Sequence, residues 1–293
     1  MLLTQHPHHT DHLEHTTTHA GAGWLGWVVP VVAAVLLGLY LVGMGRYSRR
    51  FDRGWSRWRL AGFVSGLVLM IVALSGPVSA FAHADARGHM LQHLLIGMYA
   101  PLALVMSAPV TLLLGALTPR AGRRVGAVLH TRALRLLGHP ITAAILNVGG
   151  LYVLYLTPLY AASMQRGWLH VLIAVHMLAA GYLFTWSIAG PDPAPHRPGL
   201  TLRVVTVLAA ITAHAFLGKL LYAEAGRLPA GTHYPPAQME QAAQWMYYGG
   251  EIAELVLVIA LFMWWYRHPR TTAAAAEPRR PVQATAVPLP GMR

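Results

Sequence analysis

The sequence predicts an all-α polytopic membrane protein, a bundle of seven transmembrane helices. Of its 293 residues, 55% are apolar and only 11% are charged. Several apolar runs exceed the roughly 18 residues that span a hydrocarbon core. These runs are continuous, whereas the strands of a transmembrane barrel alternate apolar with polar residues. Seven helices leave only short connections and tails, so we expect one membrane domain over residues 24–266.

The seven expected spans follow one another along the chain with short connections. In order they are Trp24 to Met44, Leu60 to Ala80, His89 to Leu117, Ile141 to Tyr160, Trp168 to Ala189, Thr201 to Tyr222 and Trp245 to Tyr266. No internal repeat and no second folded domain is evident in the sequence.

Arginine is concentrated in alternate connections, which predicts the orientation of the bundle. The connections after the first, third and fifth spans and the segment after the seventh are rich in arginine. The other connections hold little positive charge, and their arginines are Arg87, Arg166 and Arg227. By the positive-inside rule the amino terminus is outside and the carboxyl terminus is cytoplasmic, in a bacterial cell (inner) membrane. The net charge of +12 thus encodes orientation in a lipid bilayer, and no nucleic-acid partner is expected. The arginines of the rich segments are Arg46, Arg49, Arg50, Arg53, Arg57 and Arg59 after the first span, Arg120, Arg123, Arg124, Arg132 and Arg135 after the third, Arg197 and Arg203 after the fifth, and Arg267, Arg270, Arg279 and Arg280 after the seventh.

The two tails differ in composition. Residues 1–23 form a His-rich tail, expected outside, in which His8, His12, His15 and His19 recur at the spacing of one helix face, with His6 and His9 beside them. Such tracts bind metal with little selectivity, and a tail without function is the alternative. Residues 267–293, rich in Ala, Pro and Arg, predict a disordered cytoplasmic tail. The chain has no cysteine, which excludes disulfides, thiolate metal sites and thiol catalysis.

Ionisable side chains inside the apolar runs point to a metal site in the outer half of the membrane. Such groups are costly in a bilayer, so they usually face the bundle interior and carry function. With the predicted orientation, they lie within about 13 Å of the outer helix ends. The candidate ligands are His89, His93, His170, His176, His214, Glu251 and Glu254, with Met90 as a thioether candidate.

Helical spacing separates these candidates further. His89 and His93 are four residues apart and share a face, as we expect of Glu251 and Glu254, which are three apart. His170 and His176 diverge by about 120°, so only one of them can point squarely at a shared ion. The alternative is structural: histidines that pack near helix ends, and carboxyls that are protonated or bind Lys219.

One stretch resembles the signature of the multi-spanning CtaG family of cytochrome c oxidase assembly factors. It runs His89-Met90-Leu91-Gln92-His93-Leu94-Leu95, followed by Ala100-Pro101 and Ala108-Pro109. Further matches are Gly190-Pro191-Asp192-Pro193, His214 with Leu217-Gly218, and Trp245 with Gly249-Gly250-Glu251, so the similarity covers Leu60 to Tyr266. The chain departs from the family at Pro101-Leu102, where the family commonly doubles the proline. It also departs at Gln241-Ala242-Ala243-Gln244, where the family often has an acidic-Gln-Gln element.

The resemblance implies a non-enzymatic role in the maturation of a haem-copper oxidase. Imidazole and thioether groups suit copper, so we expect copper binding on the outer side and insertion into oxidase subunits. A soluble copper donor and an oligomeric state are compatible with this role. The alternatives are a haem-binding membrane electron carrier with His176 and His214 as axial ligands, a metal or proton transporter, and a docking protein without metal. Transport would need polar groups in the inner half, where Asn147 and a few hydroxyls stand almost alone.

Overall fold

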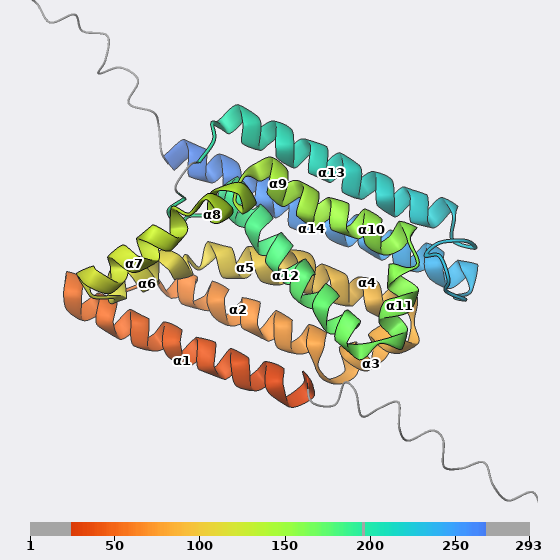
Figure 1. The fold of residues 1–293 in the computed structure, drawn as a ribbon, viewed down its shortest axis with the longest axis horizontal. Helices are drawn as coiled ribbons and strands as arrows, with labels where there is room; N and C mark the ends of the chain where they lie inside the picture. The colour runs from red at the N-terminus through yellow and green to blue at the C-terminus, as the bar shows by residue number, and fades with distance from the viewer. Residues whose placement is uncertain (1–24, 195–196, 268–293) are drawn as a thin grey trace, which may run out of the picture.

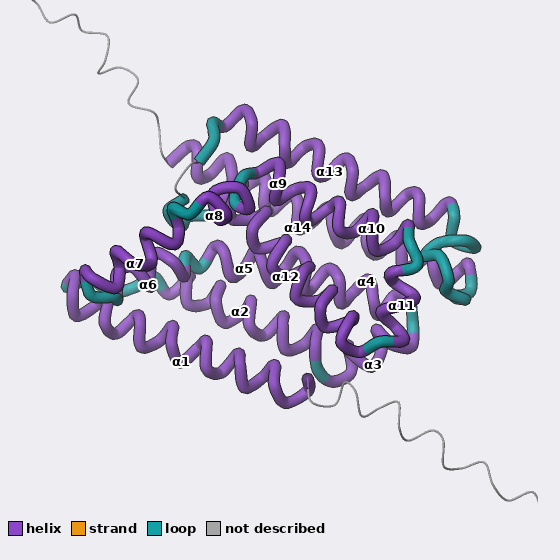
Figure 2. The backbone as a smooth tube through the Cα atoms, in the orientation of Figure 1, coloured by secondary structure: helices purple, strands orange, loops and turns teal. Residues whose placement is uncertain are grey.

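The computed structural model describes residues 25–194 and 197–267, and all regular structure in this part of the chain is helical. Figures 1 and 2 show the helices lying roughly side by side and joined by short loops. The helices are α1 (Leu25–Phe51), α2 (Arg57–Leu74), α3 (Gly76–Ala84), α4 (Ala86–Leu94), the π-helix η1 (Leu95–Tyr99), α5 (Ala100–Met106), α6 (Pro109–Ala116), α7 (Pro119–Leu129), α8 (Arg132–Leu137), α9 (Pro140–Ala144), the π-helix η2 (Ile145–Gly149), α10 (Gly150–Leu156), α11 (Leu159–Gln165), α12 (Gly167–Ala189), α13 (Leu200–Ala223) and α14 (Pro236–Arg267).

The predicted all-α fold is confirmed, and the number of spans depends on one broken helix. Six helical stretches are long and apolar enough to cross a membrane: Gly26–Phe51, Arg57–Leu74, Ala86–Ala116, Gly167–Ala189, Leu200–Ala223 and Pro236–Arg267. A seventh is formed by Pro140–Leu156 together with Leu159–Gln165, if this pair, bent by 78°, is one span. The chain is therefore a multi-pass membrane protein. The predicted tail at 1–23 lies outside the described residues, as does the predicted tail at 267–293 except for Arg267, which ends the last helix.

Four predicted span boundaries were wrong by four or more residues. The first span continues beyond Met44 to Phe51. The second span ends at Leu74 rather than Ala80, because the chain turns at Ser75 and Gly76, where Gly76 adopts a φ of 65°. The fourth ends at Leu156, because the chain leaves the helix at Thr157-Pro158 and bends into α11. The last helix begins at Pro236, nine residues before Trp245. Polar residues in its first turns hid this early start, since apolar composition marks only the part of a helix that lies in lipid.

The third span, from α4 to α6, lies at the centre of the bundle. It packs against α2, α12 and α14, while α1 covers α2 and α6 on one flank and α13 runs along α14 on the other. This span is not a regular α-helix. It widens into η1 directly after His93, and it breaks at Ala108, whose backbone is left-handed (φ 54°). A π-turn of this kind often marks a functional position.

A distant carboxylate caps the helix that follows the break at Ala108. The Asp192 carboxylate accepts hydrogen bonds from the backbone N–H of Val110 at 3.1 Å and of Thr111 at 2.7 Å, and from the Thr111 hydroxyl at 2.6 Å. These N–H groups belong to the first turn of α6, where no intrahelical acceptor exists. Two separate pieces of the sequence, Ala108-Pro109 and Gly190-Pro191-Asp192-Pro193, are thus one structural unit.

Arginine gathers at one end of the bundle. Helices α7 and α8, which carry five arginines, lie where α1 finishes and α13 begins (Figure 1). At the start of α13 the buried Arg203 donates to the Ile188 carbonyl and lies 4.3 Å from the Trp264 ring centre. Helices α3 and α11 and the start of α1 lie at the opposite end. The charge pattern that motivated the predicted orientation is therefore a property of the folded molecule.

Candidate metal site

Three of the candidate side chains meet in the middle of the bundle, each from a different span. His93 comes from the last turn of α4, His214 from α13 and Glu254 from α14, and all three are buried. His214 Nδ1 lies 3.1 Å from Glu254 Oε1, and the ring centres of His93 and His214 are 6.2 Å apart. We call His93, His214 and Glu254 the inner site.

Two glycines make room for the imidazole rings of the inner site. A Cβ atom on Gly250 would collide with the His214 ring, and one on Gly97 would lie 3.2 Å from His93 Nδ1. Nearby hydrogen bonds fix the backbones of α14 and α13 beside the site. The Tyr99 hydroxyl donates to the Gly249 carbonyl at 2.8 Å, and the Tyr152 hydroxyl donates to the Ala213 carbonyl at 2.9 Å. Gly250 therefore lets α14 approach His214 closely, and Gly249 lets it approach Leu94 of α4.

The inner site has polar atoms without partners. Both ring nitrogens of His93, His214 Nε2 and Glu254 Oε2 are buried and make no hydrogen bond to any described residue. Leaving such a group unpaired costs about 1–3 kcal/mol, and nearly all buried polar groups in proteins are paired. Four unpaired atoms on three residues that line one cavity indicate a binding site for a ligand rather than a packed core.

A small cavity of about 30 Å³ lies between these atoms, large enough for a water molecule or a metal ion. We call it the central cavity. Both π-helices reach it: Gly97 and Met98 from η1, and Asn147 and Val148 from η2. The two irregular turns of the bundle thus face one cavity, as expected if they shape a site.

A second and larger cavity of about 440 Å³, which we call the apolar cavity, borders the first. His93, Gly97 and Asn147 line both cavities, and His176 lines only the second. His176 lies over Gly150 and donates through Nε2 to the Leu146 carbonyl at 3.1 Å. This places His176 beside the inner site but outside the central cavity. His176 and His214, the pair that a haem carrier would use, line different cavities.

His89 is buried on the same side of α4 as His93 but in a different environment. Its ring stands edge-on to Tyr160 at 4.5 Å and to Tyr155 at 6.0 Å between ring centres. Both of its ring nitrogens lack a hydrogen-bond partner among the described residues. Met90 contacts one of these tyrosines, since its sulfur accepts a hydrogen bond from the Tyr155 hydroxyl at 3.4 Å. Met90 therefore packs beside His89 and does not line the central cavity.

Two other candidates lie away from the inner site. Glu254 is buried but Glu251 is exposed on the surface of α14, where it bonds the Tyr247 hydroxyl, so the expected shared face was wrong. Three residues on a helix still differ by about 60° of rotation, enough to separate interior from surface. His170 lies against His83 of α3, with ring centres 4.9 Å apart. Over residues 25–194 and 197–267, no group of three or more His, Asp or Glu side chains is already gathered around one point as a metal cage.

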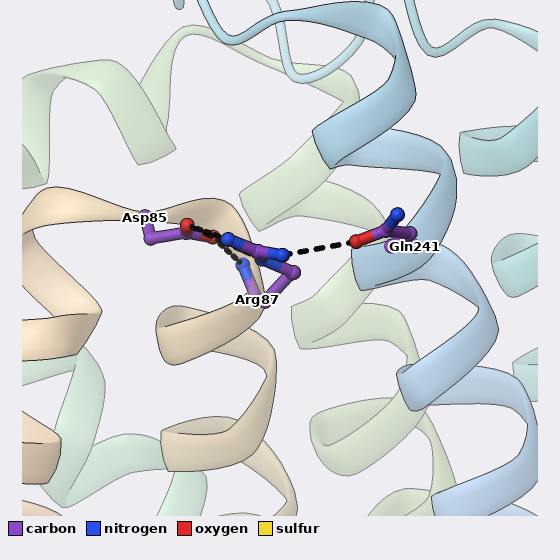
Figure 3. Close-up of polar contacts among 3 residues, drawn as sticks. All are labelled: Asp85, Arg87 and Gln241. Carbon is purple, nitrogen blue, oxygen red and sulfur yellow. Dashed lines mark hydrogen bonds and ion pairs between the residues drawn. The ribbon is translucent and has the colours of Figure 1, made fainter.

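Three contributors escaped the sequence prediction. His83 falls just after the predicted end of the second span, in a stretch expected to be a loop. Asn147 was assigned to the inner half and yet borders the central cavity. Gln241 accepts a hydrogen bond from Arg87 at 3.0 Å, so it ties α14 to the start of α4 (Figure 3).

Arg87 also anchors the first turn of α4. Its guanidinium binds the Asp85 carboxylate at 2.6 Å, and its backbone N–H donates to the same carboxylate at 2.8 Å. The hydrogen bonds from Arg87 hold the pKa of Asp85 below its usual range. Asp85 is thus the charged N-cap of the helix that carries His89 and His93.

Together these features define a helical membrane protein with a buried, polar, ligand-sized site between its spans. Residues 38–268 match the family model of the cytochrome c oxidase caa3 assembly factor, Caa3_CtaG. The chain belongs to this family.

The chain is also similar to longer mycobacterial proteins. It is 31% identical over 259 residues to an uncharacterized protein of Mycobacterium leprae, covering 82% of this chain and 39% of the relative. Uncharacterized proteins of Mycobacterium bovis and Mycobacterium tuberculosis are each 32% identical over 260 residues, covering 83% of this chain and 39% of theirs. The chain therefore spans about 39% of the length of these relatives. No solved structure matches the chain.

Proposed function

We propose that this protein binds copper at the inner site and assists its insertion into a haem-copper cytochrome c oxidase. Membership of the assembly-factor family supports a non-catalytic role with the oxidase as partner. The unpaired nitrogens of His93 and His214, facing one cavity, carry the proposal of a metal cargo. Imidazole is a good ligand for copper, and cysteine ligands are excluded by the sequence.

The spacing of the two rings suits one ion between them. Two imidazoles that bind an ion from opposite sides, each with a metal–nitrogen distance of about 2 Å, have ring centres about 6 Å apart. The ring centres of His93 and His214 are 6.2 Å apart. Copper(I) is the form that we assign to the site, because a buried site with few ligands suits a monovalent ion.

Glu254 then acts on His214 rather than on the metal. Its carboxylate lies at Nδ1 of His214, which leaves Nε2 free. Metal-binding histidines almost always donate their second ring N–H to such a partner, which fixes the tautomer and the ring orientation. In this role Glu254 is a positioning residue. The sequence prediction had placed it among the ligands.

A site with two histidine ligands also suits transfer. A cage with more ligands would hold its ion too firmly to release it, whereas two bonds are exchanged readily when a partner offers its own ligands. We place the end of the bundle that carries α3 and α11 outside the bacterial cell membrane, because the arginine-rich end is expected in the cytoplasm. Copper would then be received from a donor on that side.

Copper binding to the purified full chain tests this proposal. The six tail histidines (His6, His8, His9, His12, His15 and His19) are replaced by asparagine to leave only sites in the bundle, giving what we call the tail-silenced chain. In competition with a chromophoric copper(I) chelator, His93→Asn and His214→Asn should each weaken one site by at least tenfold, about 1.4 kcal/mol. His233→Asn, at an exposed loop histidine, is the matched control.

Oxidase activity in membranes provides the cellular readout. Cells that carry His93→Asn should assemble less active oxidase than cells with His233→Asn. If both inner-site variants remain helical and bind copper(I) as the parent does, the inner site is not the copper site.

A further inference from the structure

A second histidine pair lies nearer the end of the bundle, outside the inner site. His83 of α3 and His170 of α12 approach each other with ring centres 4.9 Å apart and planes inclined by 40°. His83 is exposed and His170 is half-buried. We call these two residues the outer pair. Both helices place them at the end opposite the arginine-rich helices α7 and α8 (Figure 1).

The hydrogen bonds of the outer pair leave ligand atoms free. His83 Nδ1 lies 2.7 Å from the Ser79 carbonyl, which can only accept, so Nδ1 is the donor. The Nε2 atom of His83 then carries the lone pair of the neutral ring. His170 makes no hydrogen bond to any residue in the described ranges. One ring is thus fixed in a metal-binding tautomer, and its neighbour is free to complete the site.

His89 connects the outer pair with the inner site. On one side, the neighbouring Gly88 packs against the backbone of Phe81 and Ala82 in α3, the helix that carries His83. On the other side, His93 follows His89 by about one turn of α4. The two ring nitrogens of His89 are buried and unpaired, and Tyr155 and Tyr160 flank its ring. The imidazoles therefore form a series from an exposed position to the central cavity: His83 with His170, then His89, then His93 with His214.

We infer that the outer pair is a second copper(I) site, at which the ion enters before it passes by way of His89 to the inner site. Each step is a ligand exchange, in which one Cu–N bond forms while another breaks. The oxidation state does not change, and a neutral imidazole binds the ion through its lone pair without losing a proton. This inference rests on the proposed copper cargo, but the outer pair can be tested separately.

Stoichiometry and loading rate distinguish the two sites. The tail-silenced chain should bind two copper(I) ions in competition with a chromophoric chelator. His83→Asn with His170→Asn should reduce this to one, and His93→Asn with His214→Asn should also reduce it to one. With one equivalent of copper(I), stopped-flow mixing should show the outer-pair variant loading at least tenfold more slowly, with unchanged final affinity.

The controls keep the outcomes separate. His233→Asn should leave both the stoichiometry and the rate at the parent values, and thermal melting with far-ultraviolet circular dichroism checks each fold. The single variant His83→Asn, at an exposed position, should already slow loading. An outer-pair variant that binds two ions and loads at the parent rate would overturn the inference. If instead the inner-site variant binds two ions while the outer-pair variant binds one, the outer pair stands and the proposed inner site fails.

Discussion

Replacing Glu254 separates a ligand from a residue that positions a ligand. The Glu254 carboxylate lies 3.1 Å from His214 Nδ1, and its second oxygen has no partner among the described residues. Glu254→Ala leaves Nδ1 without an acceptor, so the ring loses its preferred tautomer and orientation. Loss of such a partner typically weakens metal binding 10- to 100-fold, about 1.4 to 2.7 kcal/mol.

Glutamine at position 254 distinguishes a positioning role from a role as a ligand. A glutamine side chain has nearly the same shape, and its amide oxygen still accepts from Nδ1–H, but it is a poor copper ligand. The positioning role therefore predicts that Glu254→Gln recovers most of the affinity that Glu254→Ala loses. A role as a ligand predicts that both variants are equally weak.

The measurement is chelator competition with one site left in the protein. The tail-silenced chain also carries His83→Asn and His170→Asn, so that only the inner site binds copper(I). Glu251→Gln, three residues away on the exposed face of α14, is the matched control and should change the affinity by less than about threefold. Equal losses in Glu254→Ala and Glu254→Gln would refute the assignment of Glu254 as a positioning residue.

Four further predictions concern the Gly250 contact, the Asp192 cap, the Asp85 carboxylate and the orientation of the chain in the membrane. Gly250→Ala places a methyl group against the His214 ring and should weaken copper(I) binding at least tenfold, whereas Gly38→Ala, which meets no atom within 4 Å, should not; equal affinities would contradict the packing argument. Asp192→Ala removes the cap of α6 and should destabilise the fold by about 2 kcal/mol in thermal unfolding, while Asp192→Asn, which can still accept, should cost less. Because the pKa of Asp85 is lowered from 3.8, the ionised carboxylate stabilises the fold above that pH, and this contribution is lost as pH falls through the lowered pKa. The melting temperature of the parent should therefore fall more steeply below pH 4 than that of Asp85→Asn. A reporter that works only in the cytoplasm should be active when fused after Arg267 and silent before Trp24, and the reverse pattern would overturn the proposed orientation.

The helical spans were predictable because lipid imposes a simple rule on composition. A run of apolar residues must be helical to satisfy its backbone, so Trp168 to Ala189 and Thr201 to Tyr222 match α12 and α13 within a residue or two. The breaks at Gly76 and Ala108 were not predictable from hydropathy, because a single serine before each of them hardly interrupts the apolar run. The break at Ala108 is held by the Asp192 cap on α6, a tertiary contact that joins residues 81 and 82 positions apart in the chain.

The candidate site was predictable in its membership but not in its geometry. Depth and residue type brought His93, His214 and Glu254 into one list, and the structure places them together. Which of the candidate side chains face the site was decided by the rotation of each helix about its axis. Helix α14 is apolar on most sides, so periodicity gave no reason to separate Glu251 from Glu254. His83 was missed because it lies on a short helix outside the predicted spans, and its contact with the His170 ring of α12 is one that no local pattern encodes.

X-ray absorption at the copper edge tests the central claim most directly. The sample is the tail-silenced chain with His83→Asn and His170→Asn, loaded with one equivalent of copper(I). Binding by His93 and His214 predicts two nitrogen ligands at about 2 Å with the multiple-scattering pattern of imidazole, and no sulfur. This signal should disappear in His93→Asn with His214→Asn. A sulfur ligand at about 2.3 Å, or an unchanged spectrum in that double variant, would contradict the account.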